Sequence, residues 1–242
     1  MIKSIAISFL IMCLLFACKK EEVKVTYTAN QLPPLVPADT ASSKTYLALG
    51  DSYTIGQSVA EVDRFPLQTV KYLKDQGIKF GDPEIIAQTG WTTANLLSTL
   101  AFSAPLRSQY DIVTLLIGVN NQYQHRTQEE YAGQFSTLLT KALQYAGNKK
   151  SRVIVLSIPD YGVTPFAGGS DQALIAREID SFNVINKTIS IQVGVHYLDI
   201  TPASRQAAND RSLIAADGLH PSGLQYKLWA EGLVPIIKTA LQ

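Results

Sequence analysis

Short strand-like runs alternate with longer helix-like stretches from about residue 44 to the carboxyl end, and this alternation constrains the fold most. Each strand-like run is short and apolar, and a stretch with helical periodicity separates it from the next. This pattern predicts an α/β fold with a five-stranded parallel sheet and crossover helices on both faces. The expected strands are Thr45–Leu49, Glu84–Ala87, Ile112–Ile117, Val153–Ser157 and His196–Asp199.

Three of the expected helices have recognisable ends. One begins with the Thr-x-x-Glu pattern of a capping box at Thr127, carries apolar residues along one face, and stops at Gly147. A second covers about residues 170–193, and Gly194 follows it as a stop signal. The last begins with another capping box at Ser222. These signals place one helix before each of the last two expected strands and a third helix after the last strand.

Charge and cysteine content exclude several classes of function. The chain has 21 Lys and Arg against 20 Asp and Glu, so its net charge of +1 provides no basic surface for nucleic acid. Two cysteines cannot form a disulfide scaffold, and no Cys/His spacing resembles a zinc site. We therefore expect no metal and no nucleic-acid partner. A monomer without a cofactor is also expected.

The first residues have the features of a secretion signal. Lys3 precedes an apolar run, Ile5–Ala17, that is shorter than the roughly 20 residues needed to span a bilayer. Residues 1–17 are therefore predicted to be a signal peptide. The run ends in Leu15-Phe16-Ala17-Cys18, which resembles a bacterial lipobox and implies that Cys18 is lipidated and anchors the chain to the membrane. An ordinary secretory signal that happens to include Cys18 is the alternative.

A linker is expected between Cys18 and the globular domain. Residues 18–43 contain three prolines among small polar residues and have no sustained apolar periodicity. The segment Lys19-Lys20-Glu21-Glu22 resembles the signal that sends some bacterial lipoproteins to the cell surface, and a solvated tether is the alternative. The expected organisation is a signal peptide (1–17), a lipidated linker (18–43) and a hydrolase domain (44–242). The expected location is the cell envelope, as a surface-exposed outer-membrane lipoprotein.

Residues with useful chemistry follow the expected strands, where ligands bind in open α/β sheets. A serine hydroxyl attacks an acyl group when an imidazole takes its proton and an acceptor holds that imidazole. Ser52, His220 and Asp217 have these roles in our hypothesis. Backbone N–H groups of Ser52 and Gly90 and the side-chain amide of Asn120 are candidate donors to the developing oxyanion.

These residues lie in four blocks that resemble those of SGNH hydrolases of the GDSL esterase/lipase family. The resemblance implies a flavodoxin-like three-layer α/β/α sandwich, with Ser52 as nucleophile and Asp217 and His220 completing a triad. It also implies an oxyanion hole made by Ser52, Gly90 and Asn120, and a serine esterase that needs no cofactor. The blocks are Gly50-Asp51-Ser52, Gly90, Gly118-Val119-Asn120 and Asp217-Gly218-Leu219-His220.

Other residues in these loops depart from the family pattern. Tyr53 stands where leucine is usual, and we expect its side chain to point away from the serine hydroxyl. Asn121 stands where aspartate is common, and Gln88 where asparagine often precedes the glycine loop. Among the histidines, His196 opens an apolar strand and His125 has no acidic neighbour, so His220 is the preferred base.

The sequence leaves the substrate open. A small-molecule or glycan ester with a short acyl group, such as an acetylated carbohydrate, is favoured. A lysophospholipase, a thioesterase and a non-catalytic glycan-binding lipoprotein are the alternatives. The loop Tyr161–Gly169 is expected to overhang the site and shape the acyl or alcohol pocket, and a plain surface loop is the alternative. Trp91 and Tyr123 are candidates for stacking on a sugar or an aromatic ester, with core packing as their alternative role.

Overall fold

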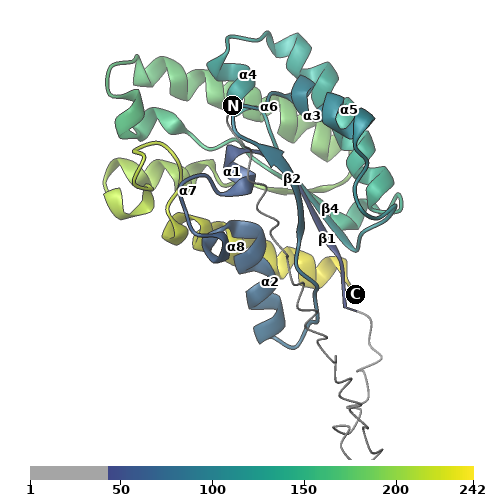
Figure 1. The fold of residues 1–242 in the computed structure, drawn as a ribbon. Coiled ribbons are helices and arrows are strands. Elements are labelled where there is room, and N and C mark those ends of the chain that lie inside the picture. Colours follow the sequence, from purple (N-terminus) through teal and green to yellow (C-terminus); the bar gives the residue numbers. More distant parts are fainter. Residues whose placement is uncertain (1–42) are drawn as a thin grey trace, which may run out of the picture. The chain divides into compact units, whose positions relative to one another are not determined.

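A sheet of five parallel strands lies at the centre of residues 43–242, which are the residues that the computed structural model describes (Figure 1). All five expected strands are confirmed, with ends that differ by a few residues. The predicted signal peptide, the predicted lipidation site Cys18 and the predicted linker as far as residue 42 lie outside the described residues. The strands are β1 (Tyr46–Asp51), β2 (Glu84–Gln88), β3 (Ile112–Leu116), β4 (Val153–Leu156) and β5 (His196–Leu198).

The strand order is β2-β1-β3-β4-β5, which is the flavodoxin-like order. In the register of the sheet, Gly50 at the end of β1 is paired with Leu116 at the end of β3. The order reverses between these two strands, and a crevice for a ligand is expected beyond their carboxyl ends. The described chain enters at the opposite end of β1, where Lys44 donates its N–H to the carbonyl of Lys79 at 2.8 Å.

Helices cover both faces of the sheet and complete a three-layer α/β/α arrangement (Figure 1). Helices α2 (Phe65–Asp75) and α8 (Gly223–Ala240) pack together on one face. Helices α3 (Thr93–Phe102), α5 (Gln128–Tyr145) and α6 (Gln172–Val193) pack on the other. The shorter helices are α1 (Ser52–Ile55), α4 (Val119–Tyr123) and α7 (Thr201–Arg205), and the 3-10 turns are η2 (Glu61–Asp63), η3 (Lys150–Arg152), η4 (Tyr161–Val163), η5 (Pro165–Ala167), η6 (Gln206–Ala208) and η7 (Arg211–Leu213).

The predicted helix ends are formed by the expected capping contacts. Thr127 Oγ1 accepts the N–H of Glu130 at 3.1 Å at the start of α5, and Ser222 accepts the N–H of Gln225 at the start of α8. Gly194 ends α6 with a φ of +85°, a conformation that glycine adopts without steric cost. The start of α6 differs slightly from the prediction because Asp171 accepts the N–H of Leu174 and caps the helix there.

The core fixes the sheet between its two helical layers. Strands β1, β3 and β4 are buried along their whole length, whereas the edge strands β2 and β5 are half-buried. Trp229 of α8 packs on Phe65 of α2 with ring centroids 6.0 Å apart, and Tyr131 of α5 packs on Phe182 of α6 at 4.8 Å. Within residues 43–242, no helix combines the length and apolar character needed to cross a membrane.

Candidate active site

Ser52 lies at the carboxyl edge of the sheet because β1 turns directly into α1. The turn needs glycine at position 50, since a Cβ there would lie 2.4 Å from the carbonyl oxygen of Leu116 and 2.1 Å from Thr54 Oγ1. Asp51 caps α1 by accepting the N–H of Tyr53 at 3.0 Å. The N–H of Ser52 belongs to the first turn of the helix, where no intrahelical carbonyl satisfies it. Ser52 therefore presents both a hydroxyl and a backbone donor.

Asp217 and His220 form a close polar pair at the site. Their atoms Oδ2 and Nδ1 are 2.6 Å apart, and Asp217 Oδ1 accepts the backbone N–H groups of Leu219 and His220, each at 3.0 Å. Burial alone would raise the pKa of Asp217, but hydrogen bonds from Ser58, from the imidazole and from the two N–H groups hold it well below its usual range. The carboxylate is thus ionised and keeps a proton on Nδ1, which leaves Nε2 as the basic nitrogen.

The structure brings the predicted nucleophile, base and oxyanion donors to one pocket. Ser52, Gly90, Asn120 and His220 all line this cavity, whose volume is about 140 Å³. Among the described residues, the Ser52 hydroxyl and the His220 imidazole border the pocket without a hydrogen bond between them. Such contacts between catalytic groups often tighten only when substrate binds. The predicted convergence of three distant segments is therefore present.

The two remaining oxyanion candidates are held in place by neighbouring loops. Gly90 follows β2 with a φ of +80°, and its carbonyl accepts Gln124 Nε2 at 3.3 Å. Asn120 Nδ2 donates to the carbonyl of Trp91 at 3.0 Å, which orients the amide and leaves its second N–H for another acceptor. Trp91 itself is not among the residues that line the pocket and packs partly buried against the core, as its alternative role predicted.

Two of the departures from the family pattern have clear consequences. The first is Tyr53, whose side chain we expect to point away from the serine hydroxyl. Its buried ring lines the pocket and contacts the imidazole of His220, with ring centroids 5.3 Å apart. Asn121 is buried and binds Thr93 twice, to the N–H at 2.9 Å and to Oγ1 at 2.7 Å. The amide therefore joins α4 to the start of α3.

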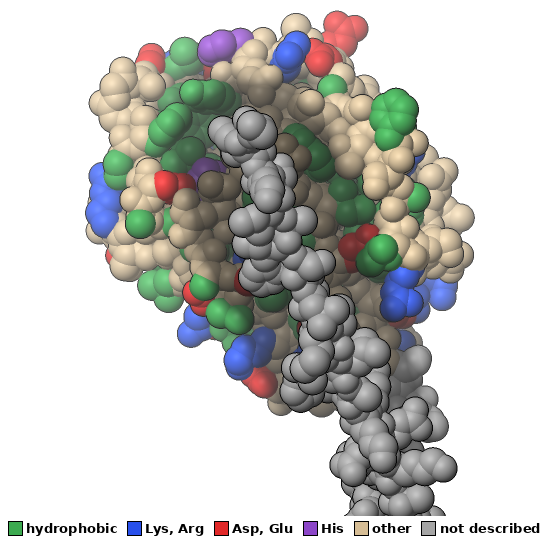
Figure 2. Space-filling model, in the orientation of Figure 1, with side chains coloured by type: hydrophobic (Ala, Val, Ile, Leu, Met, Phe, Trp, Pro, Cys, Tyr) green, Lys and Arg blue, Asp and Glu red, His purple; other side chains and the backbone are tan. Residues whose placement is uncertain are grey.

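One side of the pocket is formed by Tyr123 of α4 and by Tyr161 and Phe166 of the loop after β4, which we call the aromatic wall. Neighbouring ring centroids are 6.0 to 6.3 Å apart. Tyr123 and Phe166 remain 51% and 50% exposed, so their rings are available to a ligand. Hydrophobic side chains gather on the upper left of the face in Figure 2, over the region of this loop. Tyr161 and Phe166 belong to the loop that is expected to overhang the site, and both line the pocket.

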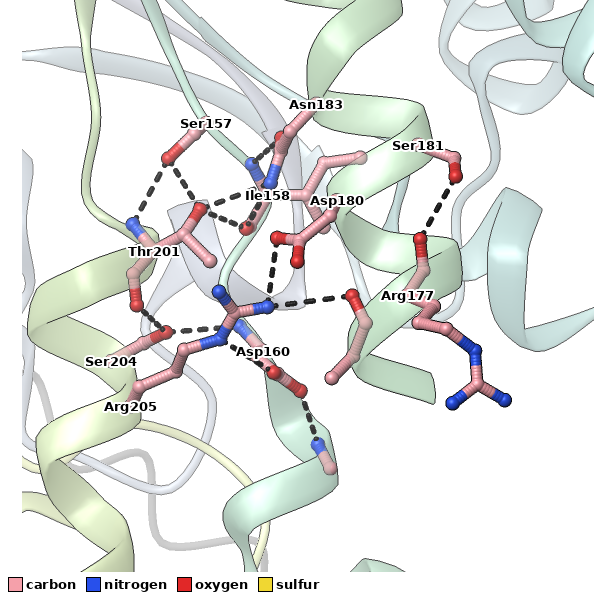
Figure 3. Close-up of polar contacts among 12 residues, drawn as sticks. Ser157, Ile158, Asp160, Arg177, Asp180, Ser181, Asn183, Thr201, Ser204 and Arg205 are labelled. Carbon is pink, nitrogen blue, oxygen red and sulfur yellow. Dashed lines mark hydrogen bonds and ion pairs between the residues drawn. The ribbon is translucent and has the colours of Figure 1, made fainter. Parts of the chain in front are cut away.

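A polar network, part of it buried, holds the segment that leads from β4 to the aromatic wall (Figure 3). The guanidinium of Arg205 on α7 lies between Asp160 and Asp180, at 2.9 and 2.8 Å. Asp160 is almost fully buried and also accepts the N–H of Gly162 at 2.8 Å. Asn183 of α6 binds both backbone polar groups of Ile158, at 2.7 and 3.0 Å. The segment that carries Tyr161 is thereby fixed to α6 and α7.

Sequence reasoning missed one residue that contacts the predicted triad. Ser58 donates its hydroxyl to Asp217 Oδ2 at 2.6 Å, across a separation of 159 residues. No motif or periodicity marks this serine, because its partner is defined only by the fold. No motif or periodicity marks the pairing between Arg205 and Asp160 either.

A serine, an imidazole–carboxylate pair and clustered hydrogen-bond donors at the carboxyl edge of a 2-1-3-4-5 sheet define a hydrolase of the SGNH type. The chain belongs to the GDSL-like lipase/acylhydrolase family, whose model matches residues 48–228, and it is a carboxylic ester hydrolase. None of the curated proteins matches the sequence.

Solved structures of esterases and related proteins share the fold. TesA has 20% identity and a TM-score of 0.60, with 82% of this chain and 100% of TesA covered. A lipase/acylhydrolase from Enterococcus faecalis has 21% identity and a TM-score of 0.62, with coverage of 82% and 97%. Axe2, an acetylxylan esterase from Geobacillus stearothermophilus, has 18% identity and a TM-score of 0.61, with coverage of 81% and 94%.

Proposed function

We propose that this chain is a serine esterase that hydrolyses carboxylic esters through an acyl-enzyme intermediate. Ser52 is the proposed nucleophile, His220 the general base and Asp217 the residue that holds the imidazole. The observation that carries the proposal is the 2.6 Å contact between His220 Nδ1 and Asp217 Oδ2 at the border of the pocket that Ser52 also lines. This arrangement matches the division of roles in a serine triad.

The proposed reaction has two half-reactions. Ser52 Oγ attacks the ester carbonyl carbon while its proton passes to His220 Nε2, and the carbonyl oxygen becomes an oxyanion. The N–H groups of Ser52 and Gly90 and the second N–H of Asn120 stabilise that charge. The intermediate then collapses, and the alcohol leaves with the proton from His220. Water attacks the acyl-enzyme by the same route, releases the acid and restores Ser52.

The aromatic wall supports a short acyl group or an acetylated carbohydrate as substrate. The half-exposed rings of Tyr123 and Phe166 lie on the same pocket as Ser52. Aromatic rings of this kind provide flat apolar area for the CH face of a sugar or for a small acyl group. The fold neighbour named as an acetylxylan esterase is consistent with this choice. We place the activity at the cell envelope because of the sequence around Cys18.

Two other functions remain as alternatives. A lysophospholipase or thioesterase would use the same groups on a longer acyl chain, and the neighbour named as a lipase/acylhydrolase favours this class. A glycan-binding protein without turnover would keep the aromatic wall. The presence of Ser52, His220 and Asp217 together argues against that second alternative.

Labelling with a fluorophosphonate tests the proposal directly. We expect an adduct on Ser52 and none in Ser52→Ala, whose kcat should fall by on the order of a million-fold because the nucleophile is lost. Ser170→Ala, which changes an exposed serine, is the matched control and should label like the wild type. A wild-type protein that stays unlabelled but binds acetylated glycans would contradict the esterase proposal.

A panel of substrates tests the substrate class. It consists of p-nitrophenyl esters of increasing chain length together with acetylated xylo-oligosaccharides. We expect the highest kcat/KM with acetyl esters, because half-exposed aromatic rings line one side of the pocket. A strong preference for long acyl chains would favour the lysophospholipase or thioesterase instead.

A further inference from the structure

The chain folds back on itself immediately after α1, in a turn formed by Gly56, Gln57 and Ser58. We call these residues the clasp turn. The N–H groups of Gly56 and Gln57 both donate to the carbonyl oxygen of Ser52. Gly56 and Ser58 have φ values of +68° and +66°, and such values are uncommon for a residue with a side chain. The clasp turn therefore lies close to the proposed nucleophile in the chain and is also hydrogen-bonded to it.

Two side-chain contacts join the clasp turn to the other segments of the site. Ser58 Oγ donates to Asp217 Oδ2 at 2.6 Å, and Gln57 Oε1 accepts Thr89 Oγ1 at 2.6 Å. Thr89 directly precedes Gly90, which is an oxyanion candidate. One turn thus contacts the segments of the nucleophile, of the acid and of the oxyanion donor, which are far apart in the sequence.

The contact with Asp217 has a specific geometric role. The oxygen that accepts the Ser58 hydroxyl is the same one that binds His220 Nδ1, whereas Oδ1 takes the two backbone N–H groups of its own loop. In the part of the chain that the structure describes, Ser58 is the one hydrogen-bond donor to this carboxylate from outside the loop 217–220. A conformationally unusual residue that contacts a predicted active-site group points to a functional constraint.

We propose that Ser58 is a positioning residue that holds Asp217, and through it His220, in the position from which the imidazole can act on Ser52. This inference rests on the proposed esterase function. The hydroxyl fixes the carboxylate relative to the turn that follows the nucleophile, so the imidazole is kept at the pocket. Ser58 acts through Asp217 and does not touch the ester.

Ser58→Ala tests the proposal because it removes the hydroxyl and keeps the Cβ, so the turn meets no new atoms. Hydrogen bonds to charged groups are the strong class, and we expect kcat to fall about tenfold while KM changes less than twofold. The low-field proton resonance of the imidazole Nδ1–H should shift or broaden in parallel. Ser58→Asn, whose side chain tolerates positive φ and carries a donor, should recover part of the lost kcat.

Ser212→Ala is the matched control, because Ser212 also donates its hydroxyl to an aspartate, Asp210, at 2.6 Å. It should keep the wild-type kcat and resonance. If Ser58→Ala does not fold, Ser58→Gly removes the same hydroxyl at a φ that glycine accepts. Wild-type kcat together with an unchanged resonance in the Ser58 variant would overturn the proposal.

The two measurements also separate this inference from the proposed function. If the wild type shows neither labelling nor turnover, the esterase proposal fails, yet the Nδ1–H resonance still reports whether Ser58 orders the Asp217–His220 pair. If the wild type is active and Ser58→Ala has the wild-type kcat and resonance, the positioning role is rejected and the esterase proposal stands.

Discussion

Asp160 and Asp217 are two carboxylates at the same edge of the sheet with different partners. Asp160 is almost fully buried and is paired with the guanidinium of Arg205 at 2.9 Å. Asp217 is part-exposed, and its side-chain partners are the neutral hydroxyl of Ser58 and the imidazole of His220, both at 2.6 Å. One carboxylate faces a permanent cation, and the other faces an imidazole, which can accept a proton during a reaction.

The comparison shows how the partner decides what an aspartate can do. A guanidinium stays charged throughout a reaction, so the Asp160 pair stabilises a loop and moves no proton. An imidazole becomes charged when it accepts a proton, and a fixed carboxylate stabilises that charge as it appears. Loss of Asp217 should therefore reduce turnover, whereas disruption of the Asp160 pair should reduce stability. The predictions below test whether the two carboxylates have these different roles.

The largest effect is expected for Asp217→Asn. The amide cannot hold the imidazole in the required tautomer as a carboxylate does, and kcat/KM should fall by on the order of 10⁴-fold, the loss seen for the same change in another serine hydrolase. The measurement is hydrolysis of p-nitrophenyl acetate, with thermal unfolding in parallel. Asp210→Asn, in the segment just before it, is the control and should remain active. A variant that keeps more than a tenth of wild-type activity would contradict the role assigned to Asp217.

Arg205→Met should act on stability. The substitution leaves Asp160 buried without its cation, and because the Arg205 side chain is 34% exposed we expect a loss of at most about 3 kcal/mol of unfolding free energy. Urea unfolding measures this loss. The double variant Asp160→Asn with Arg205→Met removes the unpaired charge and should recover part of the stability. Equal losses in the single and double variants would show that Arg205 contributes through packing instead.

A third aspartate, Asp51, is buried, and among the described residues it contacts neither a guanidinium nor an imidazole. Burial raises the pKa of Asp51 to about 7, although the N–H of Tyr53 partly opposes the shift. The unfolded chain releases this proton near pH 4, so between pH 4 and 7 the folded state holds more protons. Unfolding free energy should therefore fall as pH rises through this window, by at most about 1.4 kcal/mol per pH unit.

Asp51→Asn should remove this slope while keeping an oxygen that accepts the N–H of Tyr53. Urea unfolding at several pH values between 4.5 and 6.5 compares the two proteins. Parallel profiles for the wild type and the variant would assign the pH dependence to other groups. The lowered pKa of Asp217 acts in the opposite sense, because its contribution is present above pH 4 and is lost as pH falls below that.

The fold was predictable because its signals are local. Strand runs, the capping residues Thr127 and Ser222 and the stop at Gly194 each act within a few positions of the chain, so the sequence shows them directly. The meeting of the candidate site residues was also predictable, since Ser52, Gly90 and Asn120 come shortly after strands whose ends lie at one edge of the sheet.

Contacts between distant side chains were not predictable. The hydrogen bond from Ser58 to Asp217 and the pairing of Arg205 with Asp160 join loops that no periodicity relates. The orientation of Tyr53 depends on how α1 meets the loop that carries His220, which becomes known only when both are folded. Such contacts support the site, and their sequence signal is weak because each partner is one polar residue among many.

Strand β1 also separates the pocket from the point where the chain enters the domain. Lys44 precedes the amino end of this strand and Ser52 follows its carboxyl end, so the six residues of β1 hold the two apart by roughly 20 Å at about 3.3 Å per residue. Immobilising the protein through a tag placed ahead of residue 43 should therefore leave the mouth of the pocket open to polymeric esters, which makes amino-terminal coupling the orientation of choice for a supported catalyst.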